Sequence, residues 1–194
     1  MRVTVLLLTE DFLIPVPDAM SDDAAALAEP LGIGVHAVAK AAITPQSAVI
    51  VIGPIGPATI AALRLQGVGK IIATDYSPMR RSLASEIGAS EVFDPAAASV
   101  DERLNEHTGS GAAIYEFIAS HTLIPERVKR APEKACLVIT GIHTSETPLY
   151  LAFSSVKELD ILFSYYYTQG EFADALAAMS TGKRQWNWKI KSPW

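Results

Sequence analysis

The strongest constraint on the fold is an alternation of short apolar runs with segments of helical character. Five runs have the length of a β-strand and are apolar almost throughout, which is typical of strands buried on both faces: Ala48–Ile52, Lys70–Thr74, Glu91–Phe93, Ala113–Ile118 and Ala135–Thr140. Helical segments separate them, over Gly56–Gln66, Pro78–Ile87, Val100–His107 and Pro125–Ala131. The alternation predicts an α/β fold: a three-layer, doubly wound parallel sheet with right-handed crossovers.

The two ends of the sequence add further elements to this block. The apolar run Val3–Leu8 has strand length, and an Ile-Pro-Val-Pro connector follows it. Ser21 is placed to cap a helix, and Pro30 either kinks that helix or starts a second one that continues to about Ala42. We therefore expect residues 1–20 to be a strand and connector that precede the main domain.

The late part of the chain reads as one more strand and one more helix. The strand is expected over Glu158–Tyr167 and the helix over Glu171–Thr181, where Gly182 stops it. Residues 21–182 are thus expected to form a Rossmann-type domain, and residues 183–194 a tail with three tryptophans.

Composition narrows the class of protein. A chain of 194 residues suits one domain. Its net charge of −5, without a basic run, argues against a nucleic-acid partner. No apolar run is long enough for a signal segment or a membrane span, and a single cysteine allows no internal disulfide. We expect a cytoplasmic protein with no membrane partner.

The stretch VIVIGPIGPATIAALRLQG, which begins at Val49, is the most informative motif. It reads as a strand, a glycine turn and a helix, and Gly53 and Gly56 fill two positions of the dinucleotide fingerprint G-x-G-x-x-G. The first glycine position holds Val51. Asp75 follows the next strand at roughly the 20-residue spacing of the acid that binds ribose hydroxyls. On the glycines alone, an alternative remains: they form a strand-to-helix turn that binds no ligand.

Asp75 also bears on the choice of cofactor. An acid at this position repels a 2′-phosphate, so the spacing favours NAD(H) over NADP(H). Arg80, one helical turn further on, is placed to touch the ribose or the adenine side. An arginine near this acid can also hold a phosphate, so the preference for NAD is not absolute.

Three stretches together resemble a known family. The segment from Ile14 to Leu31, the segment from Val49 to Pro95 and the strand CLVITGIH resemble zinc-type alcohol and polyol dehydrogenases of the medium-chain dehydrogenase/reductase superfamily. The resemblance runs from about Leu8 to Gly182. It implies a Rossmann-type NAD(P)-binding domain of an oxidoreductase. The cofactor-binding residues that it implies are Gly53, Pro54, Ile55, Gly56, Asp75, Tyr76, Arg80, Ile118, Ala119, Thr140, Gly141 and Ile142.

The departures from that family are equally informative. The cysteine and the Gly-His-Glu that hold the catalytic zinc in relatives have no counterpart, and neither has the cysteine-rich zinc lobe. Only the cofactor domain is therefore expected, with no zinc site and no assigned catalytic residue. Glu29 matches a glutamate that reaches the zinc in polyol dehydrogenases, but it lacks the companion ligands.

The turn itself departs from the family pattern. It is two residues short between Pro45 and Gly56, and Val51 replaces a glycine where the chain is expected to bend. Pro57 removes an N–H group from the helix end that should face the phosphates. Ala119 stands where relatives often have glycine.

Other side chains have more ordinary interpretations. Cys136 is expected to be a core residue, and His36 a hydrogen-bonded helix histidine. His143 follows a strand at its carboxyl end, where it could face a substrate, although a loop-capping role is favoured. Arg80 and Arg81 together read as a solvated helix face. In the family the late edge strand pairs across a dimer two-fold axis, so the resemblance implies a homodimer through Glu158–Tyr167.

Two functions from different classes remain. The first is an alcohol-dehydrogenase-like, NAD(H)-binding oxidoreductase domain, whose catalytic groups come from a separate subunit or a dimer mate. The second is a non-catalytic Rossmann module that senses dinucleotide or assembles with a partner, with weak or no dinucleotide binding. Asp75 favours the first function, and the shortened turn favours the second.

Overall fold

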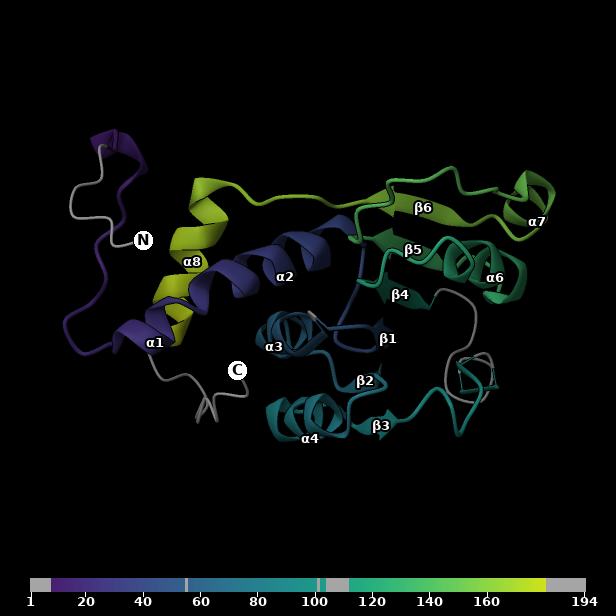
Figure 1. The fold of residues 1–194 in the computed structure, drawn as a ribbon, viewed down its shortest axis with the longest axis horizontal. Helices are drawn as coiled ribbons and strands as arrows, with labels where there is room; N and C mark the ends of the chain where they lie inside the picture. The colour runs from purple at the N-terminus through teal and green to yellow at the C-terminus, as the bar shows by residue number, and fades with distance from the viewer. Residues whose placement is uncertain (1–7, 55, 101, 104–111, 181–194) are drawn as a thin grey trace.

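The computed structural model describes residues 8–54, 56–100, 102–103 and 112–180 (Figure 1). Three predicted features therefore lie wholly or largely outside the described residues: the strand over Val3–Leu8, the helix over Val100–His107 and the tail 183–194.

The described residues form a six-stranded sheet with the order β3-β2-β1-β4-β5-β6. Every pair of neighbouring strands is parallel. The strands are β1 (Ala48–Ile52), β2 (Lys70–Thr74), β3 (Glu91–Phe93), β4 (Ala113–Glu116), β5 (Cys136–Ile139) and β6 (Asp160–Phe163). The predicted doubly wound parallel sheet is confirmed, and its winding reverses between β1 and β4.

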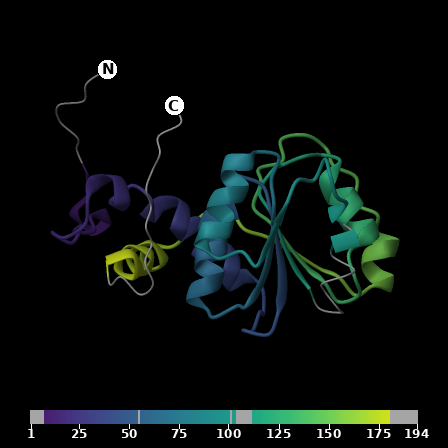
Figure 2. The same ribbon diagram turned by 90° about the horizontal axis from the view of Figure 1, so that it is seen from below.

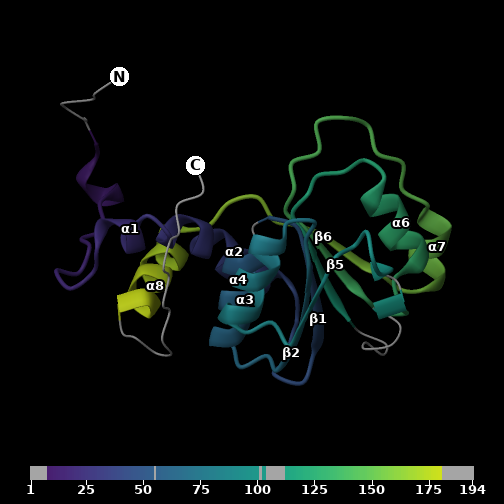
Figure 3. The same cartoon turned by 60° about the horizontal axis from the view of Figure 1, so that its bottom comes forward.

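Helices cover both faces of this sheet and make the predicted three layers (Figures 2 and 3). One face carries α2 (Ala28–Lys40), α3 (Gly56–Leu65) and α4 (Pro78–Ile87), and the other carries α6 (Leu123–Arg130) and α7 (Leu151–Val156). The short η1 (Glu10–Phe12) and α1 (Asp22–Ala25) precede α2, and α8 (Gln169–Ser180) packs against α2. None of the described helices has both the length and the apolar character needed to cross a membrane.

Local signals explain where several helices begin. The Ser21 hydroxyl accepts a hydrogen bond from the N–H of Ala24 at 3.2 Å, so it caps α1 as predicted. Pro30 lies in the first turn of α2, where its missing N–H has no intrahelical acceptor to lose. Pro30 therefore belongs to the start of a second helix and does not kink a single long one. Pro125 likewise sits in the first turn of α6, which begins at Leu123, two residues before the predicted start.

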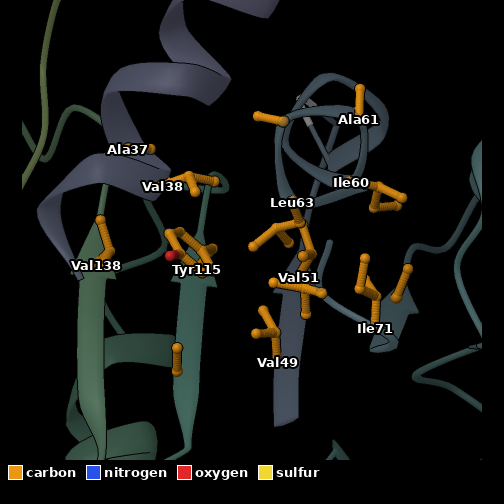
Figure 4. Close-up of a cluster of buried hydrophobic side chains, with 14 of the residues drawn as sticks. Ala37, Val38, Val49, Val51, Ile60, Ala61, Leu63, Ile71, Tyr115 and Val138 are labelled. Atoms are coloured by element: carbon orange, nitrogen blue, oxygen red, sulfur yellow. The ribbon is translucent and has the colours of Figure 1, made fainter. Parts of the chain in front are cut away.

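The core lies on both faces of the central strands. Val49 and Val51 of β1 point to the helices α2 and α3, whereas Ile50 and Ile52 point to the side of α6. Figure 4 shows the first cluster, in which Tyr115 of β4 and the β1 valines meet side chains from α2 and α3. These four β1 side chains are at most 3% exposed. Burial of each such side chain contributes about 1.5–3 kcal/mol, so the core holds β1 firmly in place.

Val51 corrects one expectation. It lies inside β1, pairs with Ala73 and Tyr115 on the two neighbouring strands, and is 1% exposed. The bend comes two residues later at Gly53, whose φ is +109°. A β-branched residue fits because the chain is still extended at Val51, so the expected conflict at this position does not arise.

The late strand is shorter than predicted. β6 ends at Phe163 because β5, its neighbour in the sheet, ends at Ile139. The following residues Tyr165–Tyr167 leave the sheet, and the ring of Tyr167 stacks on Phe172 of α8 with a centroid distance of 5.6 Å. The prediction of a strand over Glu158–Tyr167 is therefore wrong at both ends. β4 also ends early, at Glu116 instead of Ile118.

A side-chain pair ties α8 to α2. The Nδ1 atom of His36 lies 2.9 and 3.0 Å from the two carboxylate oxygens of Glu171, which also accepts hydrogen bonds from the N–H and hydroxyl of Thr168. His36 is thus the hydrogen-bonded helix histidine that the sequence suggested. Burial alone would raise the pKa of Glu171, but the hydrogen bonds from Thr168 and His36 outweigh it and lower this pKa.

This lowered pKa predicts a pH-dependent contribution to stability. A depressed carboxyl pKa stabilises the fold above the ordinary value of 4.5, and the contribution is lost as the pH falls below it. Glu171→Gln should lower the free energy of unfolding by about 1 kcal/mol at pH 7, and the gap to wild type should close towards pH 3.5. Urea unfolding at pH 7, 5 and 3.5 measures this. The exposed Glu133→Gln is the control, and a gap that stays constant with pH would contradict the assignment.

Candidate functional site

The predicted cofactor residues lie in a row along one edge of the sheet. Gly53 follows β1, Asp75 follows β2, Ile118 follows β4 and Thr140 follows β5, so all are at the carboxyl ends of parallel strands. The row spans β1 and β4, where the winding of the sheet reverses. Open α/β sheets bind ligands in the crevice at such a reversal. Ile55 is the one predicted residue that falls outside the described residues.

Asp75 is held in a fixed orientation at the end of β2. One carboxylate oxygen accepts the N–H of Ser77 at 2.7 Å, and the other accepts Nε of Arg80 at 2.7 Å. The Asp75 side chain is 10% exposed. The hydrogen bond to Asp75 raises the pKa of Arg80 above its usual value. Each carboxylate oxygen can accept a second hydrogen bond, so Asp75 retains capacity for two hydroxyl groups.

Arg81 is a supporting residue that sequence reasoning missed. Its Nη1 atom donates to the carbonyl oxygens of Asp75 and Tyr76 at 2.7 and 2.9 Å, and lies 3.1 Å from a carboxylate oxygen of Asp94. The interpretation of Arg80 and Arg81 as a solvated helix face is therefore wrong, because both guanidinium groups hold the turn after β2. The Tyr76 side chain, by contrast, is 67% exposed.

The glycine turn after β1 has few free N–H groups. The N–H of Gly53 donates to the Thr74 carbonyl at 3.3 Å, and that of Gly56 donates to the Gly53 carbonyl at 3.0 Å. Pro54 and Pro57 have no N–H group. Gly53 must be glycine, because a Cβ atom there would lie 2.7 Å from Cγ1 of Ile118. Among the described residues of this turn, the backbone donors that a phosphate would use are thus bonded inward or absent.

A small hollow lies between this turn and the turn after β2. Its volume open to the centre of a water molecule is about 10 Å³, which is close to the room needed for one water. Ala58 in the first turn of α3 has an N–H group without an intrahelical acceptor, but the residue is buried. A pyrophosphate is larger than this hollow. The lining includes Gly53, Gly56, Pro57, Asp75, Arg80 and Arg81.

The turns after β4 and β5 press closely against each other. Ala119 has a φ of +62°, in the left-handed region that glycine prefers. A Cβ atom at Gly141 would lie 2.5 Å from the nitrogen of Ala119. The side chains of Ile118 and Ile142 are 42% and 62% exposed and offer an apolar wall at the sheet edge. The Thr140 N–H is directed inward, to the Glu116 carbonyl at 2.9 Å.

Glu116 is the second functional candidate that sequence reasoning missed. It is 3% exposed at the carboxyl end of β4, and one carboxylate oxygen accepts the N–H groups of Ile118 and Ala119 at 2.6 and 2.9 Å. The available signal was a single acid inside an otherwise apolar strand. Such a residue is rarely buried unless it is paired.

The remaining candidates offer no further chemistry. Burial, together with the nearby Asp160, raises the pKa of Cys136 to about 11, so its thiol stays protonated at neutral pH. Among the residues that the structure describes, no three His, Cys, Asp or Glu side chains gather in a group able to hold a metal ion.

The sequence of the chain is similar to a family of known proteins. The sequence profile of the zinc-binding dehydrogenases matches residues 54–181. Sorbitol dehydrogenase of Bacillus subtilis is 30% identical over 91% of this chain and 52% of its own length. A probable D-xylulose reductase A of Aspergillus fumigatus is 32% identical over 91% of this chain and 51% of its own. The chain thus spans about half the length of the curated relatives it matches.

Solved structures share the fold. An alcohol dehydrogenase from Escherichia coli CFT073, determined in complex with NADH, superimposes with a TM-score of 0.77. The match covers 86% of this chain and 50% of that one, with 24% identical residues, and so concerns the fold alone.

The tight contact between the two turns predicts opposite effects of two substitutions. Ala119→Gly should not destabilise the protein, because it removes the left-handed cost of about 1–2 kcal/mol. Gly141→Ala should lower the free energy of unfolding by about 1–3 kcal/mol, because its new methyl meets backbone. Chemical unfolding measures both. Ala177→Gly, on an exposed helix position, is the control and should lose about 1 kcal/mol. A similar loss for Ala119→Gly would refute the assigned backbone conformation.

Proposed function

The chain belongs to the zinc-binding dehydrogenase family of the medium-chain dehydrogenase/reductase superfamily, and we propose that it is the NAD(H)-binding domain of an alcohol-dehydrogenase-like oxidoreductase. The observation that carries the proposal is the Asp75 carboxylate, fixed at the end of β2 beside the glycine turn. In this fold an acid at that point binds the hydroxyls of the adenosine ribose.

The charges around Asp75 support NAD(H) over NADP(H). A 2′-phosphate on the ribose would approach the Asp75 carboxylate and be repelled by it. Arg80 is already paired with that carboxylate, and Arg81 with Asp94. Neither guanidinium is therefore fully available to compensate a phosphate group.

Each part of the sheet edge has a distinct role in this proposal. Asp75 and Arg80 hold the adenosine ribose, and the apolar side chains of Ile118 and Ile142 pack against the dinucleotide further along the sheet edge and exclude water from it. Bound NAD(H) itself accepts or supplies the hydride. Substrate-binding and proton-transfer groups would come from a catalytic partner subunit or a second copy.

A second function is favoured by the glycine turn. In the part of the turn that the structure describes, the N–H groups are hydrogen-bonded or absent, and the hollow beside it is small, so these residues offer the pyrophosphate few hydrogen bonds. A charge-assisted hydrogen bond contributes about 1.5–3 kcal/mol, and the loss of two such bonds weakens binding by orders of magnitude. On this alternative the domain is a non-catalytic interaction or sensor module with weak or no dinucleotide binding.

Calorimetric titration with NAD, NADH, NADP and NADPH separates the two functions. We expect NAD(H) to bind, with NADP(H) weaker, and Asp75→Ala to weaken NAD(H) at least about tenfold, equivalent to 1.4 kcal/mol. Asp174→Ala, an exposed acid on α8, is the control and should bind as wild type does. No measurable heat with any of the four at millimolar concentration would contradict the proposal and support the interaction module.

We also propose that two copies associate through the outer edge of β6. β6 is the last strand of the sheet, so the N–H and C=O groups on its far side have no strand partner among the described residues. Phe163 is 66% exposed on this strand, and Leu151 and Val156 on the adjoining α7 are 68% and 84% exposed. A second copy paired antiparallel across a two-fold axis would cover both the edge and these side chains.

The dimer proposal predicts a charge-sensitive oligomeric state. Wild type should sediment as a dimer, and Phe163→Lys should shift it to monomer, because a lysine at the edge strand opposes strand pairing. Met79→Lys, on α4, is the control, since Met79 is also exposed, at 52%, but lies away from β6. Analytical ultracentrifugation measures this. A monomeric wild type at high micromolar concentration would rule out the pairing.

A further inference from the structure

Two acids stand side by side at one end of the sheet edge. Thr74 and Phe93, the last residues of β2 and β3, are paired in the parallel ladder. Asp75 and Asp94 come directly after them. We propose that Asp94 is a specificity-determining residue: it holds the guanidinium of Arg81 in an ion pair and so withholds this charge from a 2′-phosphate on the ribose at Asp75. The ion pair stands on the contacts alone, and its effect on the ligand rests on the proposed function.

Arg81 joins the turn after β2 to the turn after β3. Its Nη1 atom donates to the carbonyl oxygens of Asp75 and Tyr76 at 2.7 and 2.9 Å. The same atom lies 3.1 Å from Oδ2 of Asp94. Two of these three contacts are therefore made to the backbone and do not depend on Asp94. The guanidinium should keep its place when the Asp94 charge is removed.

Asp94 is itself fixed by its own turn. Its other carboxylate oxygen accepts the N–H of Ala96 at 2.9 Å, and its carbonyl oxygen accepts the N–H groups of Ala97 and Ala98 at 3.0 and 3.1 Å. The side chains of Arg81 and Asp94 are 19% and 31% exposed, so water screens their attraction only in part. An asparagine can still accept the Ala96 N–H with its amide oxygen. Asp94→Asn therefore removes the charge and keeps the turn.

Arg81 also faces the side where the ligand is proposed to lie. It lines the hollow together with Asp75 and Arg80. A guanidinium carries five N–H donors. Among the residues that the structure describes, the Nε and Nη2 atoms of Arg81 have no hydrogen-bond partner. Arg81 thus retains donors for an anion, while its charge is balanced by Asp94.

The four charged side chains at this corner cancel. Asp75 is paired with Arg80, and Asp94 with Arg81. A 2′-phosphate would therefore meet no net positive charge, whereas a ribose hydroxyl needs none. Loss of the Asp94 charge leaves the corner positive and Arg81 with donors suited to a phosphate. Asp75 stays in place to bind the ribose, so the change acts on selectivity.

The ion pair can be tested without any ligand. In ¹⁵N spectra, the Nε–H signal of Arg81 should shift in Asp94→Asn, because the neighbouring carboxylate is lost. Glu86→Gln, which removes the same charge from an exposed position on α4, is the control and should leave this signal in place. Asp94→Ser, whose hydroxyl can also accept the Ala96 N–H, keeps the test open if Asp94→Asn fails to fold. An unmoved Arg81 signal would overturn the proposal.

Binding of 5′-AMP and of 2′,5′-ADP tests the effect on the ligand. The two compounds differ only in the 2′-phosphate, and both lack the pyrophosphate and the nicotinamide. In Asp94→Asn, the dissociation constant of 2′,5′-ADP relative to that of 5′-AMP should fall about fivefold or more. The fall should shrink at about 0.5 M NaCl, because salt screens partly exposed charges. Glu86→Gln should keep the wild-type ratio, and Arg81→Leu added to Asp94→Asn should abolish the fall.

The outcomes separate this inference from the proposed function. An unchanged ratio in Asp94→Asn, with 5′-AMP still bound, would overturn the inference and leave the proposed function standing. A fall that persists after Arg81→Leu would show a general effect of charge and would also overturn the inference alone. If wild type does not bind 5′-AMP at millimolar concentration, the adenosine site that the proposed function needs is lost, and both fail.

Discussion

The hydrogen-bonded ladder on both sides of β1 is the interaction on which the rest of the structure depends. Val51 pairs with Ala73 on β2 and with Tyr115 on β4. Since all three strands run in the same direction, their carboxyl ends come level at one edge of the sheet. Apolar burial on both faces then fixes β1 between its neighbours. Residues from four separate parts of the sequence become a single row because of this register.

The two halves of that row differ in the hydrogen-bonding groups that they offer a ligand. After β2, the Asp75 carboxylate is oriented by Ser77 and Arg80 and still has acceptor capacity. After β1, the described N–H groups of the glycine turn are directed inward, and the hollow beside it is small. On the function we propose, a nucleotide at this edge would be anchored mainly through its ribose, with the phosphates contributing less than in a turn with free N–H groups.

The sequence predicted the fold well, because the buried strands are written as apolar runs. All five strands of the alternating block agree with their expected bounds to within two residues, and β1, β2 and β3 have the predicted bounds. An apolar run does not show where a strand ends when that end is set by the neighbouring strand. β6 ends at Phe163 because β5 ends at Ile139. The apolar run and the tyrosines that follow it give no sign of this end.

The candidate site was predictable where a motif fixes the backbone. Gly53 and Asp75 were found by spacing, and Ala119 was singled out by resemblance to glycine-bearing relatives and has a glycine-like φ. Contacts between distant residues were not predictable. Arg81 reaches backbone carbonyls and Asp94, and Glu116 meets His143 only because β4 and β5 are neighbours. Residue types and their spacing in the sequence do not predict such long-range contacts.

Titration of the ¹⁵N-labelled protein with NADH, followed through the backbone amide signals, tests directly whether the carboxyl edge of the sheet binds a dinucleotide. If it does, two groups of signals should shift, those of Asp75 and Tyr76 on one side and those of Ile118 and Ile142 on the other. Both groups should move with the same dissociation constant. No shifts at millimolar NADH, or shifts confined to residues away from the carboxyl edge of the sheet, would contradict this binding.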